Sequence, residues 1–367
     1  MLIDQHAMVD MNGSAPGGRM PCRLVALWLL LLVMGVVRPA VAAPLSDDEM
    51  TANLVQTVCL DQAGNPVRLL PVDPACDHHR LQAIDDTATY RKHDWPDRLD
   101  PRLPPAGYQA SDSVLQPAGP RPVIIQTFDF GDTRRVFGHF DAGQGDGGQA
   151  VMLIDGSASI AMTEDGGDGV QWFIGDNCRG TARPERHFLG WLLFRNDVTD
   201  RWHDAVTHLN KGRSPSECPA RFNMANTRYR TDKILFPFRI LDAHGALQTT
   251  RSRLDVVVSE HYGAGTIASA DHLERFYLAK GLGLVRWERW AHPSLLSSYS
   301  VSEAADRLSR SERCPAIEPE QAPDAGWKRV DCRTWTTLLT QPDAWSVARF
   351  DWPAPEALRG LGTHQAP

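Results

Sequence analysis

The chain has 367 residues, of which 42% are hydrophobic and 23% charged, and its formal net charge at pH 7 is −7. This composition is typical of a folded protein with a sizeable core rather than of a disordered chain. The acidic balance argues against a nucleic-acid partner, because binding to phosphates needs a basic surface.

The N-terminus has the pattern of a secretory signal. An unbroken apolar run covers residues 24–37, with Arg19 and Arg23 before it and the small residues Ala40 and Ala42 after it. This run is shorter than the ~20 residues with which a helix crosses a bilayer. We therefore expect residues 1–42 to be a signal peptide, the mature chain to have no membrane span, and the protein to be periplasmic or secreted from a bacterium.

Six cysteines remain in the predicted mature chain. An even number in an exported protein indicates disulfides rather than metal ligands. The short separations within the first and the last pair favour sequential pairing, and each closed loop would add about 3 kcal/mol of stability. The predicted disulfide cysteines are Cys59 with Cys76, Cys178 with Cys218, and Cys314 with Cys332.

Residues 43–95 are predicted to form a small disulfide-stapled β appendage, with strands in NLVQTVCL and PVRLLP joined by a turn. Residues 96–122 are rich in proline, which lacks the amide hydrogen that a helix or sheet needs, so this segment is predicted to be a linker. Residues 303–367, rich in Trp and Pro, are expected to wrap the core as a C-terminal extension.

Residues 123–302 are predicted to be an antiparallel β core, a sandwich or jelly-roll-like fold. Short runs with β-rich composition follow one another between Gly, Asp and Asn clusters. The best helix candidate is Val198–Leu209, with Thr199 or Asp200 as its N-cap. The strand runs are VIIQTFDF, RRVFGHFD, QAVMLID, VQWFIG, FLGWLLF, KILFPFRIL and RLDVVVSEHY.

The stretch HLERFYLAKGLGLVRWERW, residues 272–290, is predicted to be a β-hairpin with its loop at residues 280–283. In antiparallel register its pairs combine opposite charges, aromatic rings, or a cation with a ring, all of which stabilise a sheet. The segment YLAKGLGLVRWE resembles a hairpin found in various secreted and lipid-anchored bacterial β proteins, and this likeness implies no activity. The predicted pairs are Ala279 with Leu284, Leu278 with Val285, Tyr277 with Arg286, Phe276 with Trp287, Arg275 with Glu288, and Glu274 with Arg289.

Two glycine-rich acidic runs, residues 143–148 and 164–169, are interpreted as Asp-Gly turns. The first matches GxGxxG but is followed by a strand rather than a helix, so it does not indicate a dinucleotide site. The alternative is a calcium site, and no other metal or cofactor is expected. Its oxygen ligands would be Asp141, Asp146, Glu164, Asp165 and Asp168.

Candidate catalytic residues gather in residues 259–289. Cleavage of a polysaccharide by hydrolysis needs two carboxylates, for which Glu260 and Glu274 are the candidates. Cleavage by elimination needs a base and an acid beside a neutralised uronate, for which His261, Tyr262 and Arg289 are the candidates. The alternative is that VVVSEHY is simply a core strand that ends at a polar rim, and that Glu288 is the partner of Arg275.

The aromatic and basic residues of the same hairpin are candidates for binding substrate, because sugar rings stack on Trp and Tyr. These are Trp287, Trp290, Tyr277 and Arg286. Together the patterns predict an exported protein that binds or cleaves a polysaccharide, as a hydrolase or lyase. The alternative is a non-enzymatic envelope or assembly protein that docks a partner through its β surface, which would require a large exposed apolar patch.

Overall fold

The computed structural model describes only part of the chain. The chain divides into residues 1–42 and residues 43–367, and all described residues belong to the second unit. The predicted signal peptide and most of the predicted linker lie outside the described residues. The structure describes residues 43–54, 57–65, 67, 72–81, 92–94, 108–110, 115–117, 123–129, 135–141, 148–165, 169–176, 190–213, 217–241, 247–310 and 314–339.

The described residues are mainly β structure, which confirms the predicted fold class. The helices are α2 (Asp47–Leu54) and α3 (Tyr299–Ser309), with single turns at η3 (Ile267–Ser269) and η4 (Pro293–Ser297). The strands are β1 (Thr57–Leu60), β2 (His78–Leu81), β3 (Lys92–Asp94), β4 (Tyr108–Ala110), β5 (Leu115–Pro117), β6 (Val123–Asp129), β7 (Arg135–Asp141), β8 (Gly148–Ile154), β9 (Ser157–Asp165), β10 (Gly169–Gly175), β11 (Trp191–Arg195), β12 (His203–Gly212), β13 (Asn223–Leu241), β14 (Leu247–Tyr262), β15 (His272–Ala279), β16 (Gly283–Ala291) and β17 (Lys328–Leu339).

The main sheet of the described part has thirteen strands in the order β10-β12-β13-β14-β15-β16-β17-β3-β6-β7-β8-β9-β11. Neighbouring strands in this order are antiparallel, and β9 additionally pairs with β10. One parallel contact joins β13 to β17. The pairs β1–β2 and β4–β5 form two small separate sheets.

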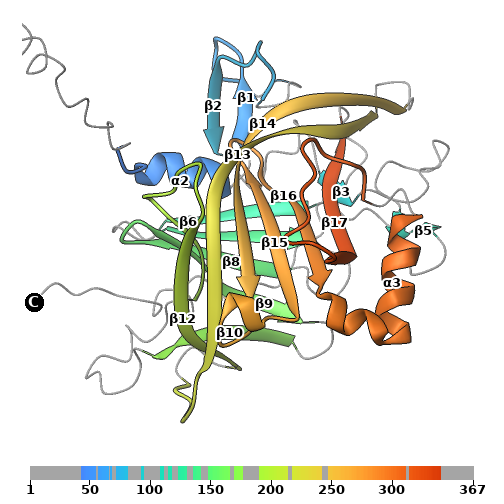
Figure 1. Cartoon of the computed structure of the whole chain (residues 1–367). Coiled ribbons are helices and arrows are strands. Elements are labelled where there is room, and N and C mark those ends of the chain that lie inside the picture. The colour runs from blue at the N-terminus through green and yellow to red at the C-terminus, as the bar shows by residue number, and fades with distance from the viewer. Residues whose placement is uncertain are drawn as a thin grey trace, which may run out of the picture. The chain divides into compact units, whose positions relative to one another are not determined.

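The two parts of this sheet face each other over a hydrophobic core. Strands β8, β9 and β10 cross behind β13–β16 (Figure 1), and one continuous cluster of buried side chains joins the two layers. The cluster includes Leu153, Ile160 and Phe194 from one layer and Val257 and Phe276 from the other. Burial of this apolar surface is the main stabilising term of such a two-layer fold.

Helix α2 closes one end of this core. It begins with a capping box in which Ser46 and Glu49 satisfy each other's backbone amides, since the Ser46 amide donates to Glu49 at 2.8 Å and the Glu49 amide to Ser46 Oγ at 3.3 Å. Its Met50 and Leu54 side chains are buried in the core cluster. The segment after the predicted signal is therefore part of the main fold.

The predicted hairpin forms, with four of its six predicted pairs in place. Glu274–Arg289, Arg275–Glu288, Phe276–Trp287 and Tyr277–Arg286 are partners. Towards the loop the register shifts by one, so Leu278 faces Leu284 and Ala279 faces Gly283. The two predicted pairs nearest the loop, Leu278 with Val285 and Ala279 with Leu284, are therefore wrong. A bulge at Val285 is the cause, because it places one extra residue in β16.

The predicted helix at Val198–Leu209 is wrong, because most of this segment is strand β12. Side chains of β12 alternate between half-buried and exposed from His203 to Thr207, which is the period of a strand. The hydroxyl of Thr199 accepts from the Arg201 amide at 3.3 Å, as in a short turn rather than at a helix start. The exposure of the side chains repeats every two residues, as in a strand, and not with the period of about 3.6 residues that a helix would show.

Two predicted disulfides are present within the described residues, Cys59–Cys76 and Cys314–Cys332. Cys218 is also disulfide-bonded, while its expected partner Cys178 lies outside the described residues. Strand β1 pairs with β2, and the Val67 amide of PVRLLP also donates to the Cys59 carbonyl at 2.9 Å. The rest of PVRLLP lies outside the described residues. In the C-terminal part β17 joins the main sheet. Among the described residues, no helix has the length and hydropathy of a membrane span.

Candidate functional site

Strands β13–β16 carry two very different faces. Because side chains alternate, Glu260, Arg275 and Glu288 lie in one row across the sheet on the face turned away from the core, which we call the outer face. His261 and Phe276 point the other way, towards the core cluster. The alternation therefore places the candidates Glu260 and Arg286 on the outer face and the candidates Glu274 and Arg289 on the other face.

Glu260 is fully buried on the outer face and is held by two arginines. Its Oε1 accepts hydrogen bonds from Arg275 Nε at 2.8 Å and Nη2 at 2.5 Å, and its Oε2 pairs with Arg228. The hydroxyl of Tyr262 donates to Oε2 at 2.5 Å. All acceptor positions of this carboxylate are thus used within the protein.

Glu288 has an equally complete set of partners. Its Oε1 lies 2.6 Å from Arg286 Nη2 and 2.9 Å from Arg329 Nη1, and its Oε2 accepts from Trp290 Nε1 at 2.8 Å. Arg275 Nη1 lies 3.8 Å away and connects Glu288 to Glu260. The expected partnership of Arg275 and Glu288 is part of a larger buried network.

A strap formed by residues 314–323 covers this network. Backbone carbonyls of the strap accept hydrogen bonds from the arginines: Pro315 O from Arg286 Nη1 at 2.5 Å, and Gln321 O from Arg275 Nη1 at 2.6 Å. The strap is pinned to β13 through Glu318, whose carbonyl accepts from the Leu235 amide at 2.7 Å. The arginine row is therefore sealed by backbone rather than left open to a substrate.

The network fixes the ionisation of its members. Burial opposes the charged form of Glu288, but Arg286, Arg329 and Arg275 outweigh it and lower its pKa to about 2. Arg275 and Arg228 likewise hold the pKa of Glu260 below its ordinary value against the effect of burial. Burial and the neighbouring Glu260 raise the pKa of Tyr262. None of these groups is poised to exchange a proton near neutral pH.

His261 lies on the core side, where no solvent reaches it. Its ring stacks on Trp191, with ring centroids 4.6 Å apart and planes 8° from parallel, and contacts Phe276 at 4.8 Å. Burial lowers the pKa of His261 to about 3. The residue is neutral at pH 7 and packs as an aromatic core side chain.

The structure does not bring the predicted catalytic pairs together. His261 is the strand partner of Glu274, whereas Glu260 is the partner of Arg275, so Glu260 and Glu274 lie on opposite faces of the sheet. Because they are consecutive in β14, His261 and Tyr262 also point to opposite faces. Glu274 is partly exposed at the rim and pairs with Arg289 at 2.8 Å.

The four predicted substrate-binding side chains are buried. Trp287 belongs to the core cluster, and its Nε1 donates to Glu274 at 3.4 Å. Trp290, Tyr277 and Arg286 lie on the outer face within the covered network. None of them presents an open ring face of the kind on which a sugar stacks.

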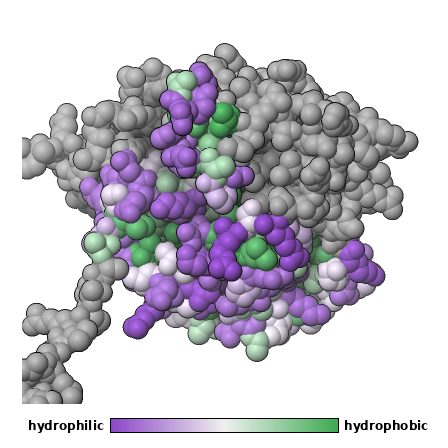
Figure 2. Space-filling model, turned by 90° about the horizontal axis from the view of Figure 1, so that it is seen from above, coloured by the Kyte–Doolittle hydropathy of each residue, from purple (hydrophilic) through white to green (hydrophobic). Residues whose placement is uncertain are grey.

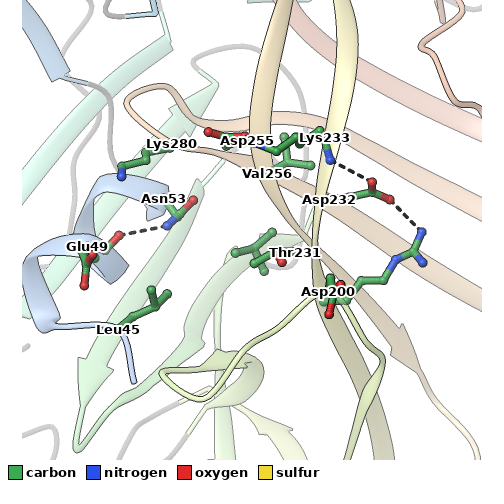
Figure 3. Close-up of a pocket in the computed structure, with 12 residues that line it drawn as sticks. Leu45, Glu49, Asn53, Asp200, Thr231, Asp232, Lys233, Asp255, Val256 and Lys280 are labelled. Atoms are coloured by element: carbon green, nitrogen blue, oxygen red, sulfur yellow. Dashed lines mark hydrogen bonds and ion pairs between the residues drawn. The ribbon is translucent and has the colours of Figure 1, made fainter. Parts of the chain in front are cut away.

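A pocket of about 520 Å³ lies beside this network, between α2, β13, β14 and the β15–β16 loop (Figure 3). In Figure 3 Glu49 and Asn53 project from α2 on one side, Lys280 lies above, and Thr231, Asp232 and Asp255 come from the strands opposite. Its volume is within the range of small-molecule sites. The lining residues are Leu45, Glu49, Asn53, Asp200, Arg230, Thr231, Asp232, Lys233, Asp255, Val256, Val257 and Lys280.

The charges of the pocket wall are nearly balanced. Lys233 Nζ lies 2.5 Å from Asp255 Oδ1, with both side chains mostly exposed, and Arg230 Nη2 lies 2.7 Å from Asp232 Oδ2. Hydrogen bonds from Ser46 lower the pKa of Glu49, which stays ionised. The wall thus offers carboxylate acceptors and ammonium or guanidinium donors that solvent can reach.

No pattern in the sequence predicted this pocket. Its residues come from segments up to 235 positions apart, from Leu45 to Lys280, and they form no recognisable local motif. Lys280 belongs to the predicted hairpin loop, Asp200 was an N-cap candidate, and Val256 and Val257 belong to the predicted strand VVVSEHY, but none of them was predicted to bind a ligand. The glycine-rich acidic runs considered for calcium lie for the most part outside the described residues, and Asp146 and Asp168 are among those outside.

One cluster of metal-binding residue types exists in the described part, formed by Glu288, Cys314 and Cys332. The two cysteines form a disulfide, and the carboxylate is used by arginines, so this group has no free ligand set for a metal.

Comparison of the chain with models of protein families, with curated proteins and with solved structures finds no match. The site is therefore interpreted from its own chemistry.

Proposed function

We propose that the mature protein is a non-enzymatic exported binding protein, and that it binds an uncharged, hydroxyl-rich ligand such as a saccharide segment in the pocket between α2 and β13–β14. The single observation that carries this proposal is the pocket itself. It combines about 520 Å³ of space with solvent-accessible carboxylate and ammonium groups on its wall.

Cleavage of the ligand is not supported by the positions of the acid and base candidates. Glu260 is buried and paired with arginines, and His261 is buried in the core. Glu274 pairs with Arg289 at the rim, on the opposite face from Glu260. A general acid or base must come within hydrogen-bonding reach of the bond that it acts on. We therefore propose binding of the ligand without its cleavage.

The near balance of charge favours an uncharged ligand. Glu49, Asp200, Asp232 and Asp255 face the three cations Arg230, Lys233 and Lys280, so the wall carries a formal charge of about −1. Such a wall does not attract a polyanion. Sugar hydroxyls donate to carboxylates and accept from ammonium groups, so they can replace the water on both kinds of group.

Docking of a protein partner through an apolar β surface has less support. Among the described residues the exposed large hydrophobic side chains are Val206, Met224 and Tyr299. Seen from above, the described residues present mostly hydrophilic side chains with small hydrophobic areas between them (Figure 2). Partner-binding surfaces usually show a broader continuous apolar patch.

The test begins with a glycan array probed with the mature protein, followed by calorimetry with each glycan that is bound. Asp255→Asn and Lys280→Gln should each weaken binding about tenfold or more, the usual effect of losing a hydrogen bond to a charged group. Asp271→Asn is the matched control. Asp271 is exposed at the far end of β15 from Lys280 and does not line the pocket.

Two results would overturn the proposal. One is the absence of saturable binding to any glycan at millimolar concentration. The other is release of reducing sugar or unsaturated uronate by the wild-type protein, because this would make the protein an enzyme. Equal weakening by Asp271→Asn would reject the pocket as the place of binding.

A further inference from the structure

The buried outer-face network contains one more cation than anions. Its arginines are Arg228, Arg230, Arg275, Arg286 and Arg329, and its carboxylates are Asp232, Glu260, Glu288 and Glu320. Five positive and four negative groups leave a formal charge of +1. Because several of these groups are buried, a leftover charge costs more here than it would in water.

The excess falls at one end of the network, around a small cavity under the strap. Glu288 and Glu320 balance Arg286 and Arg329, with which they pair. The three remaining arginines, Arg228, Arg230 and Arg275, pair with Asp232 and Glu260. Glu288, which Arg286 and Arg329 already share, lies 3.8 Å from Arg275. The same three arginines line the cavity, whose volume is about 60 Å³.

The donors around this cavity are not all used. Arg230 Nη2 donates to Asp232 at 2.7 Å and to Gln321 Oε1 at 3.0 Å, but its buried Nε has no hydrogen-bond partner among the described residues. Arg228 and Arg230 also lie over the same indole ring, with their Cζ atoms 4.5 and 4.7 Å from the centroid of Trp202. The guanidinium groups of Arg228 and Arg230 thus both stack on Trp202, and the Nε–H of Arg230 beside them lacks a hydrogen-bond acceptor.

We propose that this cavity is a binding site for a small monovalent anion, either a halide or the carboxylate group of a short organic acid. A space of 60 Å³ holds about two water molecules. This volume suits a halide or a carboxylate group, whereas a larger hydrated oxyanion would not fit. One such anion would neutralise the excess charge and accept from the guanidinium groups. This site differs in ligand and in place from the larger pocket, although Arg230 and Asp232 line both.

The proposal is tested on the mature wild-type protein by titrating sodium bromide at constant ionic strength against sodium methanesulfonate, whose anion is larger and carries no carboxylate. Saturable stabilisation is expected, with the unfolding equilibrium constant falling about tenfold between about 1 and 100 mM bromide for a Kd of about 10 mM. A parallel titration with formate distinguishes a site for carboxylates from one for halides alone. Crystals grown in bromide should show an anomalous peak between Arg228, Arg230 and Arg275.

Arg230→Gln should abolish the bromide dependence. Lys233→Gln, which removes a cation of the larger pocket and none of the small cavity, should retain it. If neither bromide nor formate stabilises the wild type saturably, or if bromide stabilises it without an anomalous peak in the cavity, the proposal is wrong. An equal bromide response in wild type and Arg230→Gln would also overturn it. The crystal experiment does not depend on the folding of any variant.

Discussion

Glu260 and Arg275 are directly opposite each other on β14 and β15, and two nitrogens of the guanidinium donate to one carboxylate oxygen, at 2.8 and 2.5 Å. Both side chains are buried, and the strap lies over them. In such an environment a charge that loses its partner is left without the water that would otherwise solvate it. The stability of the sheet therefore depends on the completeness of this row of charges.

We predict that Glu260→Gln destabilises the protein by about 3–5 kcal/mol, because it leaves Arg228 and Arg275 buried without their counter-charge. Chemical denaturation monitored by tryptophan fluorescence measures the effect. Asp255→Asn, which removes an exposed ion pair with Lys233, should cost at most about 1 kcal/mol. A similar small loss for both variants would contradict the role assigned to the buried row.

Buried His261 should make stability depend on pH below neutrality. Burial lowers its pKa from 6.5 to about 3 in the folded protein, so between these values the unfolded chain binds a proton that the folded chain does not. Stability should therefore fall as pH decreases through this window, by about 1.4 kcal/mol for each pH unit well inside it.

The measurement is the free energy of unfolding between pH 7 and pH 4.5, for wild type and for His261→Phe. Phenylalanine keeps an aromatic ring between Trp191 and Phe276 but has no titrating group. The slope due to His261 should be absent in the variant. If wild type and variant show the same slope, His261 does not remain neutral in the folded protein.

The disulfide Cys314–Cys332 should hold one end of the strap on the sheet. Replacing both cysteines with serine is expected to lower stability by about 3 kcal/mol and to speed hydrogen exchange at the Leu235 and Glu318 amides, which join strap and sheet. Removal of Cys59–Cys76 serves as the control, since that disulfide ties the β1–β2 pair. Exchange at the strap amides that is equally fast in both double variants would refute this role.

Gly190, just before β11, should not tolerate a side chain. Its φ is +73°, and an added Cβ would lie 2.5 Å from the carbonyl oxygen of Ile160. Gly190→Ala is expected to cost about 2 kcal/mol or more, from backbone strain together with the clash. Gly265→Ala is the comparison, because its Cβ would meet open space, and thermal unfolding of both variants decides the matter. Equal melting temperatures would exclude strain at Gly190.

Local patterns were sufficient for much of the fold. The strands around VVVSEHY and the pairs from Glu274–Arg289 to Tyr277–Arg286 follow from alternation and from complementary partners. The bulge at Val285 and the strand β12 escaped prediction. A bulge depends on how a hairpin packs on its neighbours. The polar residues of β12 are compatible with a helix as well as with a strand, and only the tertiary contacts of this segment determine which of the two forms.

The sequence by itself determined that this chain builds an antiparallel β fold with disulfides between near cysteines, because strand alternation and short loop closure are local properties. Only the tertiary structure decided which charges are reachable. The same glutamates and arginines would form an open site on a bare sheet, but the strap buries them, whereas α2 and the β15–β16 loop leave polar groups accessible around a pocket. Burial depends on which distant segments cover a face, and no residue spacing in the chain records it.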